Sequence, residues 1–439
     1  MEEIIGERLR LSHIDNTMNE EYFSDLRICI EKFKASLQDE KLRETFERCF
    51  FNTIYTTTFF EDDGSAFVIT GDIPAMWLRD SSAQVMQYLF FANECPSVRK
   101  LIKGLLKKQF EYILIDPYAN AFNRTANGNG HAYDLDKQSP WVWERKFELD
   151  SLCYPLWLLT RYYQKTGDKT CLNGLFLSAF DKIIEVFRTE QNHAEKSTYY
   201  HEIYNREKRL WIGKGEPVSN GGLVWSGYRP SDDKCQYGYY LPGNMFIVAV
   251  LTKLAPIFSE ALGDGTRAKI CEDLAKEIQA ELKRLAVVER DGKKIYALET
   301  DGLGNYNLMD DANIPNLLAM PYYEYPYIDG QVYKNTREYM LSFENPYYFE
   351  GKVLKGIGSP HTPKNRVWPL SLIIRALTSE DEAEIRECVR MLVNSTGGTG
   401  YIHEAVDKDD DTVYSRSWFA WANSLFAYMI LEKSRHINF

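Results

Sequence analysis

The stretch GGLVWSGYRPSDDKCQYGYYLPGNMF, residues 221–246, lies between two helical patterns, and the rest of the chain is organised around it. It is rich in glycine, proline, serine and aspartate, which interrupt helices or compete for backbone hydrogen bonds. We therefore expect a long loop carried by helices. Two adjacent carboxylates, Asp232 and Asp233, stand in it among tyrosines and a tryptophan. An isolated SDD is more often a solvated turn or a helix cap, but acids among aromatic rings suggest a place where a polar, ring-shaped molecule is held and protonated.

Helical periodicity continues on both sides of this loop. Apolar residues recur at spacings of three and four, which predicts helices at 20–53, 97–115, 147–166, 171–192, 242–262, 266–288, 366–378, 380–396 and 416–435. Strand signals are short, with one possible hairpin at 287–299. No low-complexity linker divides the chain, so we expect one all-α domain over residues 1–439. Periodicity alone fits a closed barrel, an open solenoid or a bundle.

Composition narrows the class of protein. The net charge of −11 over 439 residues argues against a nucleic-acid partner. No apolar run approaches the roughly 20 residues that span a bilayer, so no membrane association is expected. The first residues have neither the basic nor the apolar region of a secretion signal. The eight cysteines are scattered, without the spacing of a zinc site or a disulfide framework. We expect reduced thiols, a cytoplasmic location and no bound metal.

Further loops also carry charged residues. Trp77, Arg79 and Asp80 fall at the start of an expected helix, which Asp80 or Ser81 would cap. Arg79 and Asp80 would either bind a ligand or form an ion pair that braces the loop. Acidic residues gather at three further places. The first is the start of a later helix, beside a tryptophan, the second precedes an expected helix, and the third follows a glycine-rich turn. These residues are Trp143, Glu144, Arg145, Glu148 and Asp150, then Asp310 and Asp311, and then His403 and Glu404.

Carboxylates beside aromatic rings, without a cluster of histidine and cysteine ligands, suit the binding of sugar hydroxyls and the cleavage of a glycosidic bond. That cleavage needs one carboxylic acid to protonate the leaving oxygen and one carboxylate on the other side of the ring. The acid needs a raised pKa, which burial against aromatic rings provides. The residues therefore indicate a helical, carbohydrate-active enzyme.

Several long segments strengthen this interpretation. They are TGDIPAMWLRDSSAQV, NRTANGNGHAYD, SPWVWERKFELDSLCYPLWL, GLVWSGYRPSDDKCQYGYYLPGNMF, LMDDANIPNLLAMPYY, GIGSPHTP, IHEAVDKDD and YSRSWFAWANSLF. In this order, over about residues 50 to 430, the chain resembles glycoside hydrolase family 125, which contains metal-independent exo-α-1,6-mannosidases. The resemblance implies an (α/α)6 barrel with long active-site loops, an α-1,6-linked manno-oligosaccharide substrate, no cofactor, and hydrolysis with inversion of the anomeric configuration.

The resemblance also implies roles for individual residues. The general acid of the family matches Asp232, with the adjacent Asp233 as the alternative, and the general base matches Glu404. Inversion implies carboxyl groups roughly 6.5–9.5 Å apart, with a water beside the base. The expected sugar-binding residues are Trp77, Arg79, Asp80, Trp143, Glu144, Arg145, Trp225, Asp311 and His361. The chain has Ala405–Val406 after the base where the family often has Ser-Phe, which alters the contacts beside the base.

Other functions remain open at this stage. A glucoamylase-like or trehalase-like hydrolase would act on α-glucosides, and a phosphorylase would need phosphate. A zinc- or calcium-dependent mannosidase would need a cation cage, and the chain contains no convincing one. A catalytically silent mannoside-binding protein would bind sugar without turnover, but both expected catalytic carboxylates are present. The sequence does not specify the oligomeric state.

Overall fold

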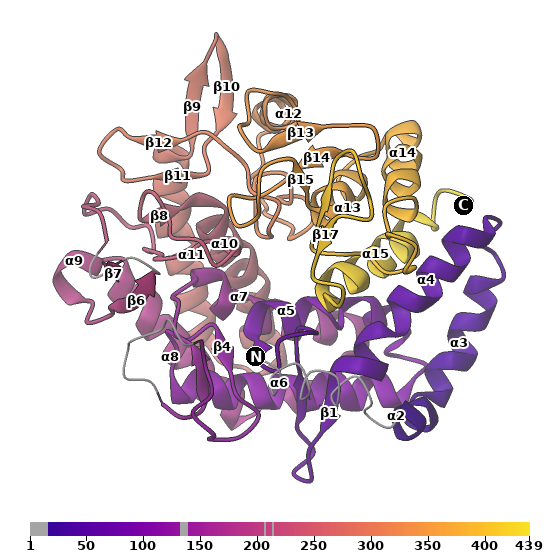
Figure 1. The fold of residues 1–439 in the computed structure, drawn as a ribbon. Coiled ribbons are helices and arrows are strands. Elements are labelled where there is room, and N and C mark those ends of the chain that lie inside the picture. The colour runs from indigo at the N-terminus through magenta and orange to yellow at the C-terminus, as the bar shows by residue number, and fades with distance from the viewer. Residues whose placement is uncertain (1–15, 132–138, 206–207, 213–214) are drawn as a thin grey trace.

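The protein is described from a computed structural model that covers residues 16–131, 139–205, 208–212 and 215–439 (Figure 1). The remaining residues, including the first residues, where no secretion signal is expected, and part of the NRTANGNGHAYD segment, lie outside this description. The described α-helices are α2 (Asn16–Tyr22), α3 (Ser24–Lys34), α4 (Glu40–Asn52), α5 (Leu78–Ala83), α6 (Pro96–Ile115), α7 (Leu149–Thr166), α8 (Gly174–Glu190), α9 (His193–Lys196), α10 (Leu241–Pro256), α11 (Gly265–Leu285), α12 (Gly330–Met340), α13 (Pro369–Leu377), α14 (Glu382–Val393) and α15 (Ala420–Lys433). The predicted helix-rich class is confirmed.

Short irregular helices extend or connect these elements. They are the π-helices η1 (Thr53–Thr57) and η4 (Ile257–Ala261) and the 3-10 helices η2 (Met86–Phe91) and η3 (Lys169–Cys171). The expectation that no segment is long and apolar enough to span a bilayer is wrong for one described helix, the α10–η4 segment Leu241–Ala261, which passes by length and composition. Most of it is buried inside the protein, as in the core helix of a folded domain.

The strands are short and form small antiparallel sheets. They are β1 (Thr58–Phe60), β2 (Ala66–Val68), β3 (Met76–Trp77), β4 (Ala121–Phe122), β5 (Val142–Glu144), β6 (His201–Asn205), β7 (Lys208–Ile212), β8 (Tyr239–Tyr240), β9 (Val287–Arg290), β10 (Lys293–Tyr296), β11 (Glu299–Thr300), β12 (Tyr306–Asn307), β13 (Tyr348–Glu350), β14 (Lys355–Ile357), β15 (Arg366–Val367), β16 (Ala405–Asp407) and β17 (Tyr414–Ser415). Three of the sheets have three strands, β3-β4-β5, β12-β11-β8 and β15-β16-β17. The hairpin predicted at 287–299 is confirmed as β9 and β10.

Local sequence explains many helix ends. Asp39 begins α4 by accepting a hydrogen bond from Leu42 N, and Asn173 begins α8 in the same way, because side-chain oxygens satisfy the free N–H groups of a first turn. Asp39 also explains why the helix predicted over 20–53 is interrupted, since a new helix starts there. Gly167 ends α7 with a left-handed backbone (φ 66°), which glycine adopts without steric cost.

Two local predictions are wrong. The helix expected after Asp310 and Asp311 does not form; turns run from there towards α12, because Pro315 and Pro321 interrupt a helical ladder. At α5, neither Asp80 nor Ser81 is the cap. The capping position belongs to Trp77, and the Ser81 hydroxyl, inside the helix, donates to the Trp77 carbonyl at 2.7 Å.

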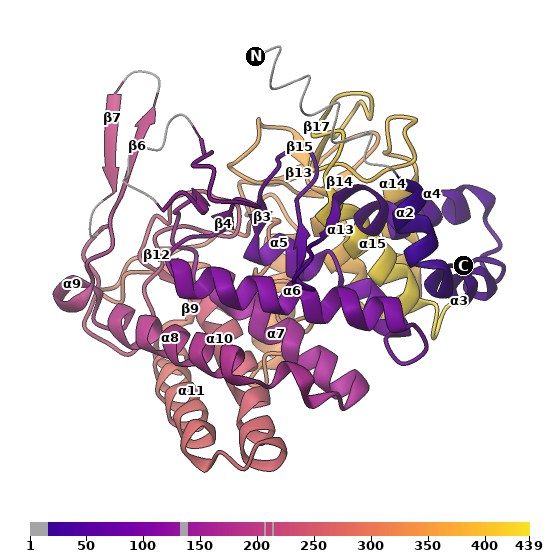
Figure 2. The same cartoon turned by 90° about the horizontal axis from the view of Figure 1, so that it is seen from below.

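The helices pack around one large hydrophobic core that includes residues from Phe23 to Phe439. Helix α10 packs on both α7 and α11, and α13 packs on α14 and α15. Near the two ends of the chain, α4 packs against α15, and Figure 1 shows these helices side by side. In Figure 2, strands β3, β4, β13, β15 and β17 lie on one side of the helices. This strand-bearing side carries the segments in which the sequence predicts the functional residues.

Candidate active site

A cavity of about 200 Å³ lies among these loops. Seven of the predicted residues line it, namely Trp77, Arg79, Asp80, Glu144, Asp232, His361 and Glu404. They come from β3, α5, β5 and loops far apart in the chain, so the fold brings together most of the polar groups that the sequence singled out. Its remaining lining residues are Thr70, Ile73, His131, Lys146, Pro230, Ser231, Asn313, Trp368, Arg416, Phe419 and Trp421.

Arg79 is the centre of the charge arrangement. Its guanidinium is buried and lies 5.6 Å from the ring of Trp421. It forms ion pairs with Glu148 and, at 3.3 Å, with Asp80 and Asp232. Opposite charge this close, in a buried setting, holds the carboxyl groups and the arginine in one geometry.

The structure separates the two adjacent aspartates. Asp232 has a left-handed backbone (φ 66°), a conformation that costs energy for a residue with a Cβ and that persists where the surroundings impose it. Its side chain lines the cavity and accepts a hydrogen bond of 3.3 Å from Arg79. Asp233 is not a lining residue, and its carboxylate lies 3.4 Å from Nδ1 of His361. The geometry favours Asp232 as the group that meets a ligand.

Glu404 reaches the cavity from the residue just before β16. Ser415 donates a hydrogen bond of 2.8 Å to its Oε2, and Nη1 of Arg416 lies 3.5 Å from its Oε1. Arg416 is held in turn by Asp72 and by a bond of 2.8 Å to Thr70. Ala405 and Val406, the residues that depart from the family pattern, are buried in the core. The carboxylate of Glu404 is therefore fixed on one side and faces the cavity on the other.

Burial and charge shift the pKa values of this site. Burial is the main cause that raises the pKa of Asp80 to about 6, against the opposing effect of Arg79. Burial also acts to raise the pKa of Asp232, but Lys146, a hydrogen bond with Glu148, and Arg79 together lower it below its ordinary value. For Glu148, burial raises the pKa well above its ordinary value. The raised pKa expected of the general acid is therefore not found at Asp232, because the charges around it outweigh burial; the raised pKa belongs to Glu148.

His361 lies at the rim of the cavity, with 38% of its side chain exposed. Burial of the ring acts to lower its pKa, but the hydrogen bond and charge of Asp233, with the charges of Asp232 and Glu404, raise it to about 9. His361 is therefore positively charged near neutral pH.

Three predicted sugar-binding residues lie next to the cavity or away from it. Trp143 donates a hydrogen bond of 3.2 Å to His131, which is a lining residue. Asp311 is buried and accepts a hydrogen bond of 2.9 Å from Asn313, another lining residue, so it supports the wall. Arg145 pairs with Asp116 at 2.7 Å and lies over the rings of Tyr118 and Tyr199, away from the cavity.

Trp225, expected to bind sugar, is buried and is not among the residues that line the cavity. Its side chain is 1% exposed and stacks on His193 with the ring centroids 3.6 Å apart. A Cβ at Gly238 would lie 2.4 Å from its ring, so the glycine permits this close packing. The aromatic position in the central loop is therefore part of the core.

Sequence reasoning missed several lining residues. Lys146 lies 3.3 Å from Glu144, two positions further along the chain, and this spacing was a usable signal. Arg416 and Trp421 belong to the segment YSRSWFAWANSLF, which carries the resemblance but holds no acidic pair. Asn313 had no local signal, since a single asparagine in a turn is common.

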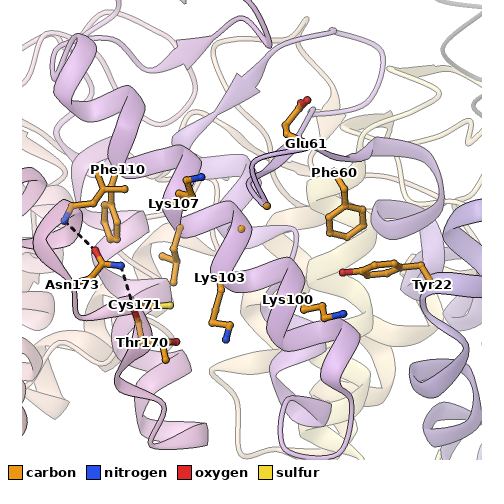
Figure 3. Close-up of a pocket in the computed structure, with 14 residues that line it drawn as sticks. Tyr22, Phe60, Glu61, Lys100, Lys103, Lys107, Phe110, Thr170, Cys171 and Asn173 are labelled. Carbon is orange, nitrogen blue, oxygen red and sulfur yellow. Dashed lines mark hydrogen bonds between the residues drawn. The ribbon is translucent and has the colours of Figure 1, made fainter.

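A larger cavity, of about 600 Å³, lies along α6 (Figure 3). Lys100, Lys103 and Lys107 line it together with Tyr22 and Phe60. Lys103 pairs with Asp168 and Lys107 with Asp63, and none of the predicted site residues lies there. Its pairing of lysines with surface acids is typical of a solvated groove. Within the described residues, no group of three or more histidine, cysteine or acidic side chains is arranged to hold a metal ion.

Paired carboxylates, two arginines and several aromatic rings around one small polar cavity are typical of glycoside hydrolases. The comparisons with known proteins agree with this class. Residues 39–431 match the sequence profile of glycoside hydrolase family 125, the metal-independent α-mannosidases. The chain belongs to this family, and it is a glycoside hydrolase of the α-mannosidase type.

Individual relatives support the assignment. One solved structure is of a Streptococcus pneumoniae protein of the metal-independent α-mannosidases, in a non-productive complex with α-1,6-mannobiose. Its sequence is 39% identical to this chain, and the two structures match with a TM-score of 0.88 over 100% of this chain and 99% of that one. The meiotically up-regulated gene 157 protein of Schizosaccharomyces pombe is 38% identical over 92% of this chain and 84% of its own length. A glucoamylase from Saccharomycopsis fibuligera shares the fold, with a TM-score of 0.57 and 10% identity over 94% of this chain and 96% of that one.

Proposed function

We propose that the protein is an exo-acting α-1,6-mannosidase that releases terminal mannose from manno-oligosaccharides with inversion of configuration. The observation that carries the proposal is the 39% identical relative that binds α-1,6-mannobiose, combined with a cavity lined by both Asp232 and Glu404. A cavity as small as about 200 Å³ suits the binding and removal of a single terminal sugar.

In this reaction Asp232 protonates the leaving O6 atom, and Glu404 takes a proton from the attacking water. Glu404 suits the base because Ser415 and Arg416 hold its two oxygens in place at the cavity wall. Asp232 suits the acid because its strained backbone directs the carboxyl into the cavity. Asp80, Glu144 and His361 provide hydrogen-bonding groups for mannose hydroxyls.

The remaining wall completes the site. The ring of Trp77 is available to the apolar face of the sugar. Arg79, Asp80, Glu144 and Lys146 are charged groups in a buried setting, where hydrogen bonds to hydroxyls are strong because water is largely excluded. Such a wall discriminates between sugars through the orientation of their hydroxyl groups.

The helices are consistent with an (α/α)6 barrel, which we infer as the architecture. The packing of α10 on α11 and of α13 on α14 fits successive helix pairs, and contact between α4 and α15 fits closure of a ring. The shared fold with a glucoamylase supports the same inference. Electron density that traces alternating inner and outer helices around a ring tests it.

A cytoplasmic location is also part of the proposal. All eight cysteines are free thiols, which suits a reducing compartment. Fractionation of the source cells tests this, and activity found in the culture medium would contradict it.

The function is tested by an NMR time course with α-1,6-mannobiose in the presence of a chelator. We expect β-mannose to appear first, and Asp232→Ala and Glu404→Ala to be inactive, while Asp233→Ala keeps measurable turnover. Early α-mannose contradicts the role of Glu404 as the base for water. Turnover of α-glucosides alone selects a glucoamylase-like hydrolase, and tight mannoside binding without turnover selects a binding protein.

A further inference from the structure

Arg79 is surrounded by more negative groups than it can neutralise. Its guanidinium lies within ion-pair distance of four carboxyl groups, those of Asp80, Glu148, Asp150 and Asp232. The side chains of Glu148 and Asp150 are fully buried. Several ionised carboxylates around one cation in a buried space repel one another strongly, so part of this cluster holds protons at neutral pH.

The geometry around Glu148 identifies where one of these protons lies. Oε2 of Glu148 accepts from Nη1 of Arg79 and, at 3.2 Å, from the Ser151 hydroxyl. Oε1 is buried and meets no donor in the part of the chain that is described. Glu148 and Asp232 share the guanidinium of Arg79, with Glu148 at Nη1 and Asp232 3.3 Å from Nη2, so their carboxyl groups are neighbours. A hydrogen bond between them raises the pKa of Glu148 and lowers that of Asp232. Two carboxyl groups form such a bond only when one of them carries a proton.

We propose that Glu148 is the proton store of this active site: it carries the shared proton in the empty enzyme and passes it to Asp232 for delivery to the leaving oxygen. The inference rests on the proposed function, and it adds a positioning residue that acts through Asp232. Neither oxygen of Glu148 is needed for sugar contact, since Glu148 is not among the residues that line the cavity.

The bonds and protons are accounted for in three steps, followed by exchange with solvent. The O–H bond of Glu148 breaks and an O–H bond forms on Asp232, which leaves Glu148 ionised beside Arg79. Asp232 then gives this proton to the leaving oxygen, which receives the electron pair of the broken bond to the sugar carbon. A water molecule attacks that carbon and loses a proton to Glu404. Exchange with solvent later removes the proton from Glu404 and restores one to the Glu148–Asp232 pair.

The surrounding charges suit this direction of transfer. In the empty site, burial raises the pKa of Glu148, while Lys146, Arg79 and His361 help to lower that of Asp232. A bound sugar excludes water from Asp232 and moves the shared proton towards it, because burial disfavours its charged form. Across the packed elements, the titratable and charged groups facing this pair are Arg79, Asp80, Lys146, Asp150, Cys235 and His361.

The test compares two substrates in Glu148→Gln, which keeps the shape of the side chain but holds no transferable proton. Mannobiose needs an acid for its leaving oxygen, and a dinitrophenyl α-mannoside does not. For mannobiose we expect kcat at neutral pH to fall by about 10–100-fold, within the range for general acid catalysis, with KM nearly unchanged. The loss should shrink as the pH is lowered, because solvent then protonates Asp232. For the dinitrophenyl substrate, kcat should stay within about 3-fold.

Matched variants distinguish this role from a structural one. Asp150→Asn alters the same arginine cluster, but its losses should be equal for the two substrates and independent of pH. Asp232→Asn should lose mannobiose turnover and keep the activated substrate, and Glu404→Gln should lose both. Equal losses on both substrates in Glu148→Gln, or a raised KM without a pH effect, would overturn the proton store.

Two further outcomes are decisive. If circular dichroism shows that Glu148→Gln does not fold, Glu148→Asp replaces it as the test variant, because it retains a carboxyl group. Its kcat should fall more on mannobiose than on the activated substrate, and equal losses overturn the proposal. If the unmodified enzyme hydrolyses neither mannoside, the proposed function itself is wrong. If the unmodified enzyme turns over normally but the Glu148 variants lose the same kcat on both substrates, only the role of Glu148 as proton store is wrong.

Discussion

The hydroxyl of Ser415, in β17, donates a hydrogen bond of 2.8 Å to Oε2 of Glu404, the residue just before β16. Ser415 lies opposite Ala405 in the register of β16 and β17, so the backbone pairing places the hydroxyl beside the carboxylate. The departure from the family at Ala405 and Val406 therefore points into the core and leaves this contact intact.

Removing this hydroxyl should leave the Glu404 carboxylate less firmly positioned for the attacking water. We expect Ser415→Ala to lower kcat on mannobiose and on a dinitrophenyl mannoside equally, by about 10–100-fold, because a hydrogen bond to a charged group contributes about 1.5–3 kcal/mol. Ser415→Thr keeps the hydroxyl and serves as the control. Steady-state kinetics measure the effect, and a change confined to KM would contradict it.

Trp225 should matter for stability and not for sugar binding. Its ring is buried against His193 and Gly238, so Trp225→Phe creates a cavity and should lower the free energy of unfolding by about 1–3 kcal/mol. Urea unfolding measures this loss. The KM for mannobiose should stay within experimental error; Trp77→Phe, at the cavity wall, provides the contrast with a raised KM. A raised KM in Trp225→Phe would contradict this and support a contact between the Trp225 ring and the sugar.

Asp310 should make the protein less stable as the pH rises. Its side chain is buried, and burial raises its pKa from 3.8 to about 8, against the hydrogen bonds from the backbone N–H groups of Leu317 and Leu318. A carboxyl group with a raised folded pKa contributes stability that is present below its unfolded pKa and is lost as the pH rises through the folded value. The stability that Asp310 contributes should therefore decline between about pH 4 and pH 8.

Denaturant unfolding over this pH range checks the expectation, and Asp310→Asn should flatten the dependence. Asp264 is the matched control, because its hydrogen bonds from the backbone N–H and side chain of Arg267 lower its pKa. Stability from Asp264 should be present above its unfolded pKa and lost as the pH falls. If Asp310→Asn retains the full decline of the unmodified protein, the proposed titration is wrong.

His361 should control the alkaline limit of activity. Its positive charge, retained up to about pH 9, helps to lower the pKa of Asp232. We expect the Glu148–Asp232 pair to keep its proton to higher pH in His361→Asn. The alkaline limb of the plot of kcat against pH should therefore move to higher pH. His193→Asn, at the buried ring stack on Trp225, is the control and should leave the limb in place. A downward shift in His361→Asn would contradict the charge effect.

Much of the fold was accessible from the sequence. The helices at α6, α7, α11 and α14 begin and end within a few residues of the predicted ranges, because a period of 3.6 and terminal caps are local properties. The helix expected after Asp310 failed for a local reason as well, since two prolines in that segment outweigh its apolar spacing.

The candidate site was accessible only in part. Sequence alone determined that acidic loops with aromatic neighbours recur between helices, and it identified seven residues that line one cavity. The tertiary structure decided which of two adjacent aspartates enters that cavity, that Trp225 belongs to the core, and that Glu148 joins Arg79 and Asp232. Arg79 is 69 positions from Glu148 and 153 from Asp232. Periodicity and propensity act over a few residues, whereas contacts across such separations, and the pKa shifts they cause, arise only when the helices pack.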